Sequence, residues 1–225
     1  MRGAVSRFFV AFLLSAGAFG LFLSYPAPVA RADDKATQLE LDGLDLYQHG
    51  DVNGAIDKFR QALAIKPNDK GIHNNLAEFL NNAGVTLYQS KDYAGATAKF
   101  QEAVSLAPAF KKAHDNLGMA QAAQLNIDGN VLYKAGNFDA AADKFRQALA
   151  DSPTDPSARV NLDLAETEIL TKNKDFAGAV AKLQDALTVT PSSVMIQGRL
   201  ATAQAALLEV QQKADAEKDK NSKSK

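Results

Sequence analysis

A short residue pattern occurs four times along the chain at nearly regular intervals. Each copy has an alanine, an aromatic residue or leucine four positions later, a second alanine three positions after that, and a proline five positions further on. The four copies are Ala55, Phe59, Ala62 and Pro67; Ala96, Phe100, Ala103 and Pro108; Ala141, Phe145, Ala148 and Pro153; and Ala179, Leu183, Ala186 and Pro191. Twelve positions before the first alanine, the copies carry Gly43, Gly84, Gly129 and, in the last copy, Thr167. Self-similarity of this kind indicates a repeat array.

The spacing of the alanines and the large residue places them on one face of a helix. Proline ends each helix, because it cannot continue one. Before each helix the segments QHGDVNGA, QSKDYAGA, KAGNFDAA and KNKDFAGA predict a tight turn with Asp or Asn as a helix cap. Each unit is therefore expected to be a helix–turn–helix hairpin that must stack on its neighbours to bury its apolar face.

The pattern resembles the tetratricopeptide repeat, with Gly, Ala, Phe, Ala and Pro at that family's offsets, as in LYQHGDVNGAIDKFRQALAIKP. The segments IHNNLA, AHDNLG and ARVNLD are similar to the start of the family's first helix. The resemblance covers Ala36 to Pro191 and implies an all-α fold, a right-handed superhelical stack of about four hairpins. Val194–Gln212 is expected to be a capping helix, so that the domain spans positions 33–212.

The repeats are longer than the family's unit of about 34 residues. The intervals between successive first alanines are 41 (positions 55 to 96), 45 (96 to 141) and 38 (141 to 179). The surpluses of 7, 11 and 4 lie between each proline and the next glycine position. These lengths are close to whole helical turns, which predicts that the first helices of repeats two, three and four are lengthened in phase. The alternative is a kinked or broken helix at NNAG or NIDGN.

The segment 1–32 has the pattern of a secretory signal peptide. Arg2 and Arg7 precede an apolar run over positions 8–24, and small residues at Ala30 and Ala32 precede Asp33. Cleavage after Ala32 is expected, with a retained membrane anchor at positions 8–24 as the alternative.

The charge of the remaining chain argues against a nucleic-acid partner. Removal of the segment 1–32 takes away three of the 25 basic residues and none of the 26 acidic residues, so acids outnumber bases by four. The charged segment 213–225 has no apolar stripe and is predicted to be disordered.

No chemistry of an enzyme is evident in the sequence. Cysteine is absent, and the three histidines, His49, His73 and His114, are far apart. We expect packing roles for His73 and His114, because both lie near the start of a first helix, and we expect no metal site, no cofactor, no small-molecule substrate and no catalytic residue.

Two sets of polar residues on the first helices are candidates for a partner-binding groove. The first set is Asn75, Asn116 and Asn161, each directly before a Leu. Their amides can hold the backbone of an extended peptide, and they resemble the asparagine ladder of the O-linked N-acetylglucosamine transferases. The alternative is hydrogen bonding within the array.

The second set is Tyr47, Tyr88 and Tyr133, each four residues after its glycine. Tyrosine is common in contact surfaces, and the alternative is packing between adjacent helices. The basic clamp by which some co-chaperones of the family hold a terminal carboxylate is missing. Its positions carry Glu40, Glu78, Asn81, Val85, Asn126 and Asn130.

Together these features predict an exported adaptor, bacterial periplasmic or secreted, without enzymatic activity, that binds a protein or peptide partner in its concave groove. A self-assembling scaffold that forms a homo-oligomer and a non-catalytic accessory subunit of an envelope enzyme complex are the alternatives. Contact with a membrane is expected only if the N-terminal segment is not cleaved.

Overall fold

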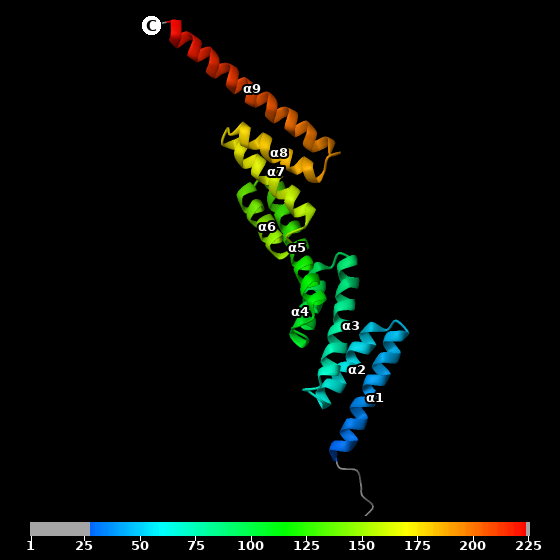
Figure 1. Ribbon diagram of the computed structural model, residues 1–225. Coiled ribbons are helices and arrows are strands. Elements are labelled where there is room, and N and C mark those ends of the chain that lie inside the picture. The colour runs from blue at the N-terminus through cyan, green and yellow to red at the C-terminus, as the bar shows by residue number, and fades with distance from the viewer. Residues whose placement is uncertain (1–27, 224–225) are drawn as a thin grey trace, which may run out of the picture.

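The computed structural model describes residues 28–223, which form nine α-helices and no strand. The helices are α1 (Pro28–Gln48), α2 (Val52–Ile65), α3 (Lys70–Gln89), α4 (Tyr93–Leu106), α5 (Lys111–Lys134), α6 (Phe138–Asp151), α7 (Pro156–Lys172), α8 (Phe176–Val189) and α9 (Val194–Lys223). Consecutive helices pair into four hairpins, which follow one another along the molecule, and α9 packs on α8 (Figure 1). The prediction of an all-α stack of helical hairpins is confirmed.

The second helix of every hairpin has the same length and the same type of start. The helices α2, α4, α6 and α8 each have 14 residues. Three of them are capped by an Asp side chain that accepts a hydrogen bond from a glycine N–H three residues later. These pairs are Asp51 with Gly54 at 2.9 Å, Asp92 with Gly95 at 2.9 Å and Asp175 with Gly178 at 2.8 Å. The turn before each cap contains a residue with positive φ, and the four residues are Gly50, Lys91, Gly136 and Lys174.

The core explains why each repeat pairs a glycine with a phenylalanine. Phe59, Phe100 and Phe145 are at most 1% exposed. A Cβ atom on the glycine that packs on each ring would lie 2.7, 2.6 or 2.5 Å from a ring carbon, in the pairs Gly43–Phe59, Gly84–Phe100 and Gly129–Phe145. The fourth hairpin has Thr167 and Leu183 at these places, so that the smaller Leu accompanies the larger residue opposite it. The glycine is therefore a packing requirement of the large ring.

The first helices carry the surplus residues, as predicted. The helices α3, α5 and α7 have 20, 24 and 17 residues. Thus α5 exceeds α3 by four and α3 exceeds α7 by three, which are the differences between the surpluses of the three repeats. Both α3 and α5 run without interruption through NNAG and NIDGN. The alternative of a broken helix is therefore wrong, and whole turns keep both ends of each helix facing the array.

The limits of the first and last helices do not coincide with the segment limits predicted from the sequence. Residues 1–27 of the predicted signal peptide lie outside the described part of the chain, and α1 begins at Pro28. The helix α9 begins at Val194 but continues to Lys223, where the sequence predicted a disordered tail. This end of α9 is exposed, and its pairs Lys213–Glu209 and Lys218–Asp215 have helical spacing, which supports a helix without any apolar stripe. Among the described helices, none is long and apolar enough to cross a membrane.

Candidate binding groove

Two hollows occupy the same place in successive repeats. The repeat-3 hollow has a volume of about 530 Å³ and lies between α5, the α6–α7 loop and the end of α3. The repeat-2 hollow has a volume of about 850 Å³ and lies between α3 and the α4–α5 loop. Both use the helix positions ten, six, three and two residues before the glycine, which are Met119, Ala123, Asn126 and Ile127 in α5 and Asn74, Glu78, Asn81 and Asn82 in α3. The hollows therefore belong to one face of the array.

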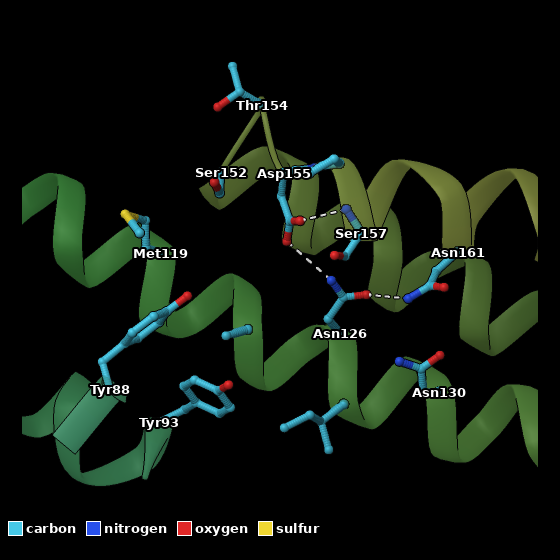
Figure 2. A pocket seen from close by; sticks show the side chains of 13 residues that line it. Tyr88, Tyr93, Met119, Asn126, Asn130, Ser152, Thr154, Asp155, Ser157 and Asn161 are labelled. Atoms are coloured by element: carbon cyan, nitrogen blue, oxygen red, sulfur yellow. Dashed lines mark hydrogen bonds between the residues drawn. The ribbon is translucent and has the colours of Figure 1, made fainter. Parts of the chain in front are cut away.

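The repeat-3 hollow combines an apolar wall with a row of amides (Figure 2). The rings of Tyr88 and Tyr93 meet edge to face, with centroids 5.1 Å apart. Met119 and Ile127 are 45% and 44% exposed, and they lie together in one hollow rather than scattered over the surface. The side-chain amide of Asn130 faces the same space and makes no hydrogen bond within residues 28–223. This mixture suits a ligand with both apolar groups and amide groups.

Asn126 links the wall of this hollow to the start of α7. Its Nδ2 donates to Asp155 Oδ2 at 3.1 Å, and its Oδ1 accepts from Asn161 Nδ2 at 2.9 Å. Asp155 Oδ1 accepts from the backbone N–H groups of Ser157 at 2.8 Å and Ala158 at 3.3 Å. Both carboxylate oxygens of Asp155 are thus used inside the protein, and this carboxylate caps the helix.

Some members of the predicted asparagine set make hydrogen bonds between successive hairpins (here called joints), and one also lines the groove. Asn116 Nδ2 donates to Asn81 Oδ1 at 2.7 Å, a contact that joins α5 to α3 as Asn161–Asn126 joins α7 to α5. The side chain of Asn75 is half-buried and makes no hydrogen bond in the described part of the chain. Of the three, Asn161 alone lines the repeat-3 hollow. The alternative of bonding within the array therefore holds for Asn116 and Asn161, while peptide binding by the set stays a prediction.

The predicted tyrosine set is divided in the same way. Tyr47 Oη accepts from Asn82 Nδ2 at 2.6 Å, and Tyr133 Oη donates to Glu168 at 3.1 Å. In both pairs the partner follows the tyrosine by 35 residues. Tyr88 has Ala123 at that distance, and its hydroxyl makes no hydrogen bond within residues 28–223. Burial raises the pKa of Tyr88, so its hydroxyl stays a donor at neutral pH. Tyr88 is therefore the member of the set that a ligand can reach.

The sequence interpretation named Asn81 and Asn126 only as positions that lack a basic clamp, and it did not predict their hydrogen bonds to the next first helix. Each lies three residues before a glycine and 35 residues before the asparagine that it binds. That interval recurs in the tyrosine pairs, and it was available in the sequence as a second periodicity. The interval does not coincide with the repeat period, because the repeats themselves differ in length.

The three histidines are not brought together. His49 and His114 are exposed, and each ring contacts a backbone carbonyl oxygen, that of Asp45 and that of Pro108, both at 2.8 Å. The expected packing role is therefore wrong for His114, because its position at the first turn of α5 faces solvent. His73 is half-buried and lines the repeat-2 hollow.

Comparison with known proteins identifies the family. Models described as TPR repeat and Tetratricopeptide repeat match residues 43–82, 77–110 and 128–194, which together span more than half of the chain. No curated protein matches the sequence.

Solved structures similar to this one include three tetratricopeptide repeat proteins. The first repeat domain of Spaghetti (RPAP3), bound to the HSP90 peptide SRMEEVD, is 20% identical with a TM-score of 0.28, over 61% of this chain and 94% of that one. The TPR2AB domain of yeast Sti1, in a complex with pHSP90, is 16% identical with a TM-score of 0.34, over 78% and 85%. A repeat protein of Parabacteroides merdae is 15% identical with a TM-score of 0.34, over 82% and 78%. With three matching family models and four stacked hairpins, the chain belongs to the tetratricopeptide repeat family.

Proposed function

We propose that the chain is a non-enzymatic adaptor that binds an extended segment of a partner protein along the face of the two hollows. The observation that carries this proposal is the repeat-3 hollow, where exposed Met119 and Ile127 lie beside polar groups without a partner in the described structure. Exposed apolar groups next to unused hydrogen-bonding groups are typical of a recognition surface. Membership of a repeat family whose stacked units form extended surfaces supports the same role.

An extended segment fits the groups that line the hollow. The amide of Asn130 offers two donors and an acceptor, and Asn161 keeps its Oδ1 unused within the described residues after donating to Asn126. Such groups can bind backbone N–H and C=O groups, while Met119 and Ile127 contact a side chain of the segment. Because the hollows recur in successive repeats, one segment can contact both.

Site-specific photocrosslinking in the cells that produce the protein tests the proposal. A photoreactive residue in place of Met119 should form a crosslinked product with a discrete partner, because this side chain is exposed in the hollow. The matched control is the same residue in place of Gln147, an exposed residue of the second helix α6. Equal products from both positions, or none from Met119, would refute binding in the hollow.

A substitution at Asn130 separates binding from stability. Since the side chain of Asn130 makes no hydrogen bond within the described residues, Asn130→Ala should reduce crosslinking through Met119 without lowering the melting temperature. Asn116→Ala is the contrasting variant, because it breaks the joint with Asn81 and should reduce stability. The triple change of Asn75, Asn116 and Asn161 to Ala should therefore affect both properties. If the triple variant binds the crosslinked partner with unchanged affinity, the asparagine ladder is excluded.

The compartment is a separate part of the proposal. We infer export with a mature N-terminus at Asp33, from the basic residues Arg2 and Arg7, the apolar run at 8–24 and the small residues at Ala30 and Ala32. Measurement of the intact mass of the protein from its natural source checks this inference. A product that retains Met1 would favour a membrane anchor instead.

A further inference from the structure

The fourth hairpin lacks the tyrosine that the other three hairpins carry near the end of their first helix. Tyr47, Tyr88 and Tyr133 lie four residues after the glycine position in the first three hairpins, and Thr171 lies there in the fourth. The three tyrosines are half-buried, whereas Thr171 is exposed. A ring that three hairpins supply from their own chain is therefore missing from the fourth.

A hollow lies at the place of the missing ring. The repeat-4 hollow has a volume of about 450 Å³ and lies between α7, α8 and α9, where α9 follows the fourth hairpin (Figure 1). Thr171 lines it, and so does Leu183, a residue of the hydrophobic core that is 1% exposed. The hollow extends to this core side chain because Thr171 is too short to cover it.

The fourth hairpin has kept the aromatic residue on which the missing ring would pack. In the two middle hairpins the tyrosine meets the first residue of the second helix edge to face. The ring centroids are 5.1 Å apart in Tyr88–Tyr93 and 5.2 Å apart in Tyr133–Phe138, with interplanar angles of 67° and 65°. Phe176 is the first residue of α8 and lines the repeat-4 hollow, and within residues 28–223 its ring contacts no other aromatic ring. One half of a repeated aromatic pair is thus present without the other.

The repeat-4 hollow continues the face on which the repeat-3 hollow lies. The two hollows share four lining positions of the repeat, which are Thr171, Phe176, Thr202 and Ala206 in one and Tyr88, Tyr93, Met119 and Ala123 in the other. Ala206 follows Thr171 by 35 residues, as Ala123 follows Tyr88. A segment that lies along this face therefore passes the repeat-4 hollow.

The charged groups in the lining are already paired. Arg199 Nη1 lies 2.8 Å from Glu168 Oε1, and both groups bond the hydroxyl of Tyr133. No other lining residue of this hollow is charged, so an incoming charge would find no unpaired partner there. Met195 lines the same hollow and is 55% exposed. An exposed thioether and an unpaired ring both suit an aromatic group, because sulfur–aromatic and edge-to-face contacts are stabilising.

We propose that a Phe or Tyr side chain of the bound partner segment enters the repeat-4 hollow and packs edge to face on Phe176. The ring takes the place that the protein's own tyrosine takes in the other hairpins, with Leu183 beneath it. The inference rests on the proposed function and specifies one residue of the segment. That residue is an aromatic anchor at the α9 end of the face.

Nuclear magnetic resonance titration of the purified chain tests this recognition without a known partner. The probe is N-acetylphenylalanine N-methylamide, and N-acetylcyclohexylalanine N-methylamide is its non-aromatic match. The phenyl probe should shift the methyl signals of Leu183 and the backbone amide signals of Thr171 and Ala206 in a saturable way. It should bind roughly threefold or more tightly than the cyclohexyl probe, because only an aromatic ring gains the edge-to-face contact with Phe176. No shift at these groups would overturn the proposal, and equal affinities would overturn the assignment to an aromatic side chain.

A substitution that restores the repeat residue supplies the matched test. Thr171→Tyr should fill the hollow, abolish binding of the phenyl probe and raise the melting temperature, because the added ring buries apolar surface. Thr188→Tyr is the control, because Thr188 is exposed on α8 and does not line the hollow. Phe176→Leu should make the affinities of the phenyl and cyclohexyl probes equal. Loss of binding in both tyrosine variants, or an unchanged preference for the phenyl probe in Phe176→Leu, would refute the site.

The use of this hollow by the partner is tested in the cells that produce the protein. Thr171→Tyr should reduce photocrosslinking through Met119, which lies outside the repeat-4 hollow, whereas Thr188→Tyr should not. Unchanged crosslinking in Thr171→Tyr would show that the segment does not use the hollow. Conversion of a dimer into a monomer by Thr171→Tyr, measured by sedimentation, would identify a second copy of the chain as the occupant and overturn the assignment to a partner.

The two proposals fail in different ways. If photocrosslinking through Met119 persists while the phenyl probe does not bind, the adaptor function stands and the aromatic anchor is wrong. If the phenyl probe binds at Thr171 but no partner crosslinks through Met119, the recognition of a ring stands and binding of a segment in the groove is wrong.

Discussion

Asp163 is a charged residue at a position where the other repeats have leucine. It lies four residues before Thr167, and the corresponding residues before the three glycines are Leu39, Leu80 and Leu125. Its side chain is 3% exposed, one oxygen lies 3.9 Å from Lys182 Nζ, and the other has no hydrogen-bond partner within the described residues. A buried carboxylate with so few partners destabilises the folded state. We therefore expect Asp163→Leu to stabilise the protein.

The size of the effect follows from two contributions. Burial raises the pKa of Asp163 from 3.8 to about 6 against the opposing effect of Lys182, and a pKa difference of about two corresponds to about 3 kcal/mol at most. Burying a leucine side chain adds about 1.5–3 kcal/mol, from which about 1 kcal/mol is lost through imperfect fit. Lys182 keeps its 2.7 Å ion pair with Glu166, so no new unpaired charge arises. Together the two contributions should raise the free energy of unfolding by roughly 4 kcal/mol near neutral pH.

The effect should depend on pH in a defined direction. The pKa of Asp163 is higher in the folded state than in the unfolded state, so the folded state binds more protons between about pH 4 and pH 6. The wild-type protein therefore loses stability through this group as the pH rises through that window. Asp163→Leu lacks this loss, and its advantage should be about 2 kcal/mol at about pH 4.5 and about 4 kcal/mol at about pH 7.5, of which about 1 kcal/mol at either pH comes from the buried leucine.

Urea unfolding monitored by circular dichroism at both pH values measures these differences. Asp163→Asn is the control, because it removes the titrating group without adding apolar surface. Its gain in the free energy of unfolding should therefore consist of the pH-dependent contribution only. Taking the difference from wild type cancels the contributions of all other titrating groups. A gain for Asp163→Leu that is the same at both pH values, or a loss at both, would refute the reasoning.

Three further predictions concern packing and backbone. Phe145→Ala should lower the free energy of unfolding by roughly 3–5 kcal/mol, and Leu183→Ala should lower it less, because Leu183 lies nearer the end of the array; equal melting shifts would contradict this. Leu183→Phe alone should destabilise the protein, and it should do so much less when Thr167→Gly makes room for the ring. A double-mutant cycle should give a coupling of about 1 kcal/mol or more, and additive effects would contradict the packing argument. Lys91→Gly should raise the free energy of unfolding in urea by about 1 kcal/mol, because Lys91 has φ of 67°, and a lowered value would show that its conformation is not strained.

Contacts within one hairpin were readable from the sequence because they depend on fixed intervals. The pairing of Gly84 with Phe100 lies within two helices and the turn between them, and the interval between the paired residues is the same in every repeat. Proline and Asp mark the helix ends through local backbone chemistry, which requires no knowledge of the neighbours. The lengthened first helices followed from the same local rule, since a helix accommodates whole turns without rotating its apolar face.

The candidate site could be predicted only in part, because its residues come from different repeats. Asn161 and Tyr88 line the hollow, whereas Asn116 and Tyr47 are used in hydrogen bonds between hairpins. Whether a member of a repeated set remains available to a partner depends on the residue 35 positions later, such as Ala123 after Tyr88. That dependence is a property of how two hairpins dock.

The sequence by itself determined the repeat architecture, the helix limits within each hairpin and the matching of small and large residues in the core. All of these follow from helical periodicity and local capping. The tertiary structure decided which polar groups are used up between hairpins and which remain for a partner. Hydrogen bonds such as Asn126–Asp155 form across helices whose relative position is set by packing of the whole array, and this packing also decides where the hollows open.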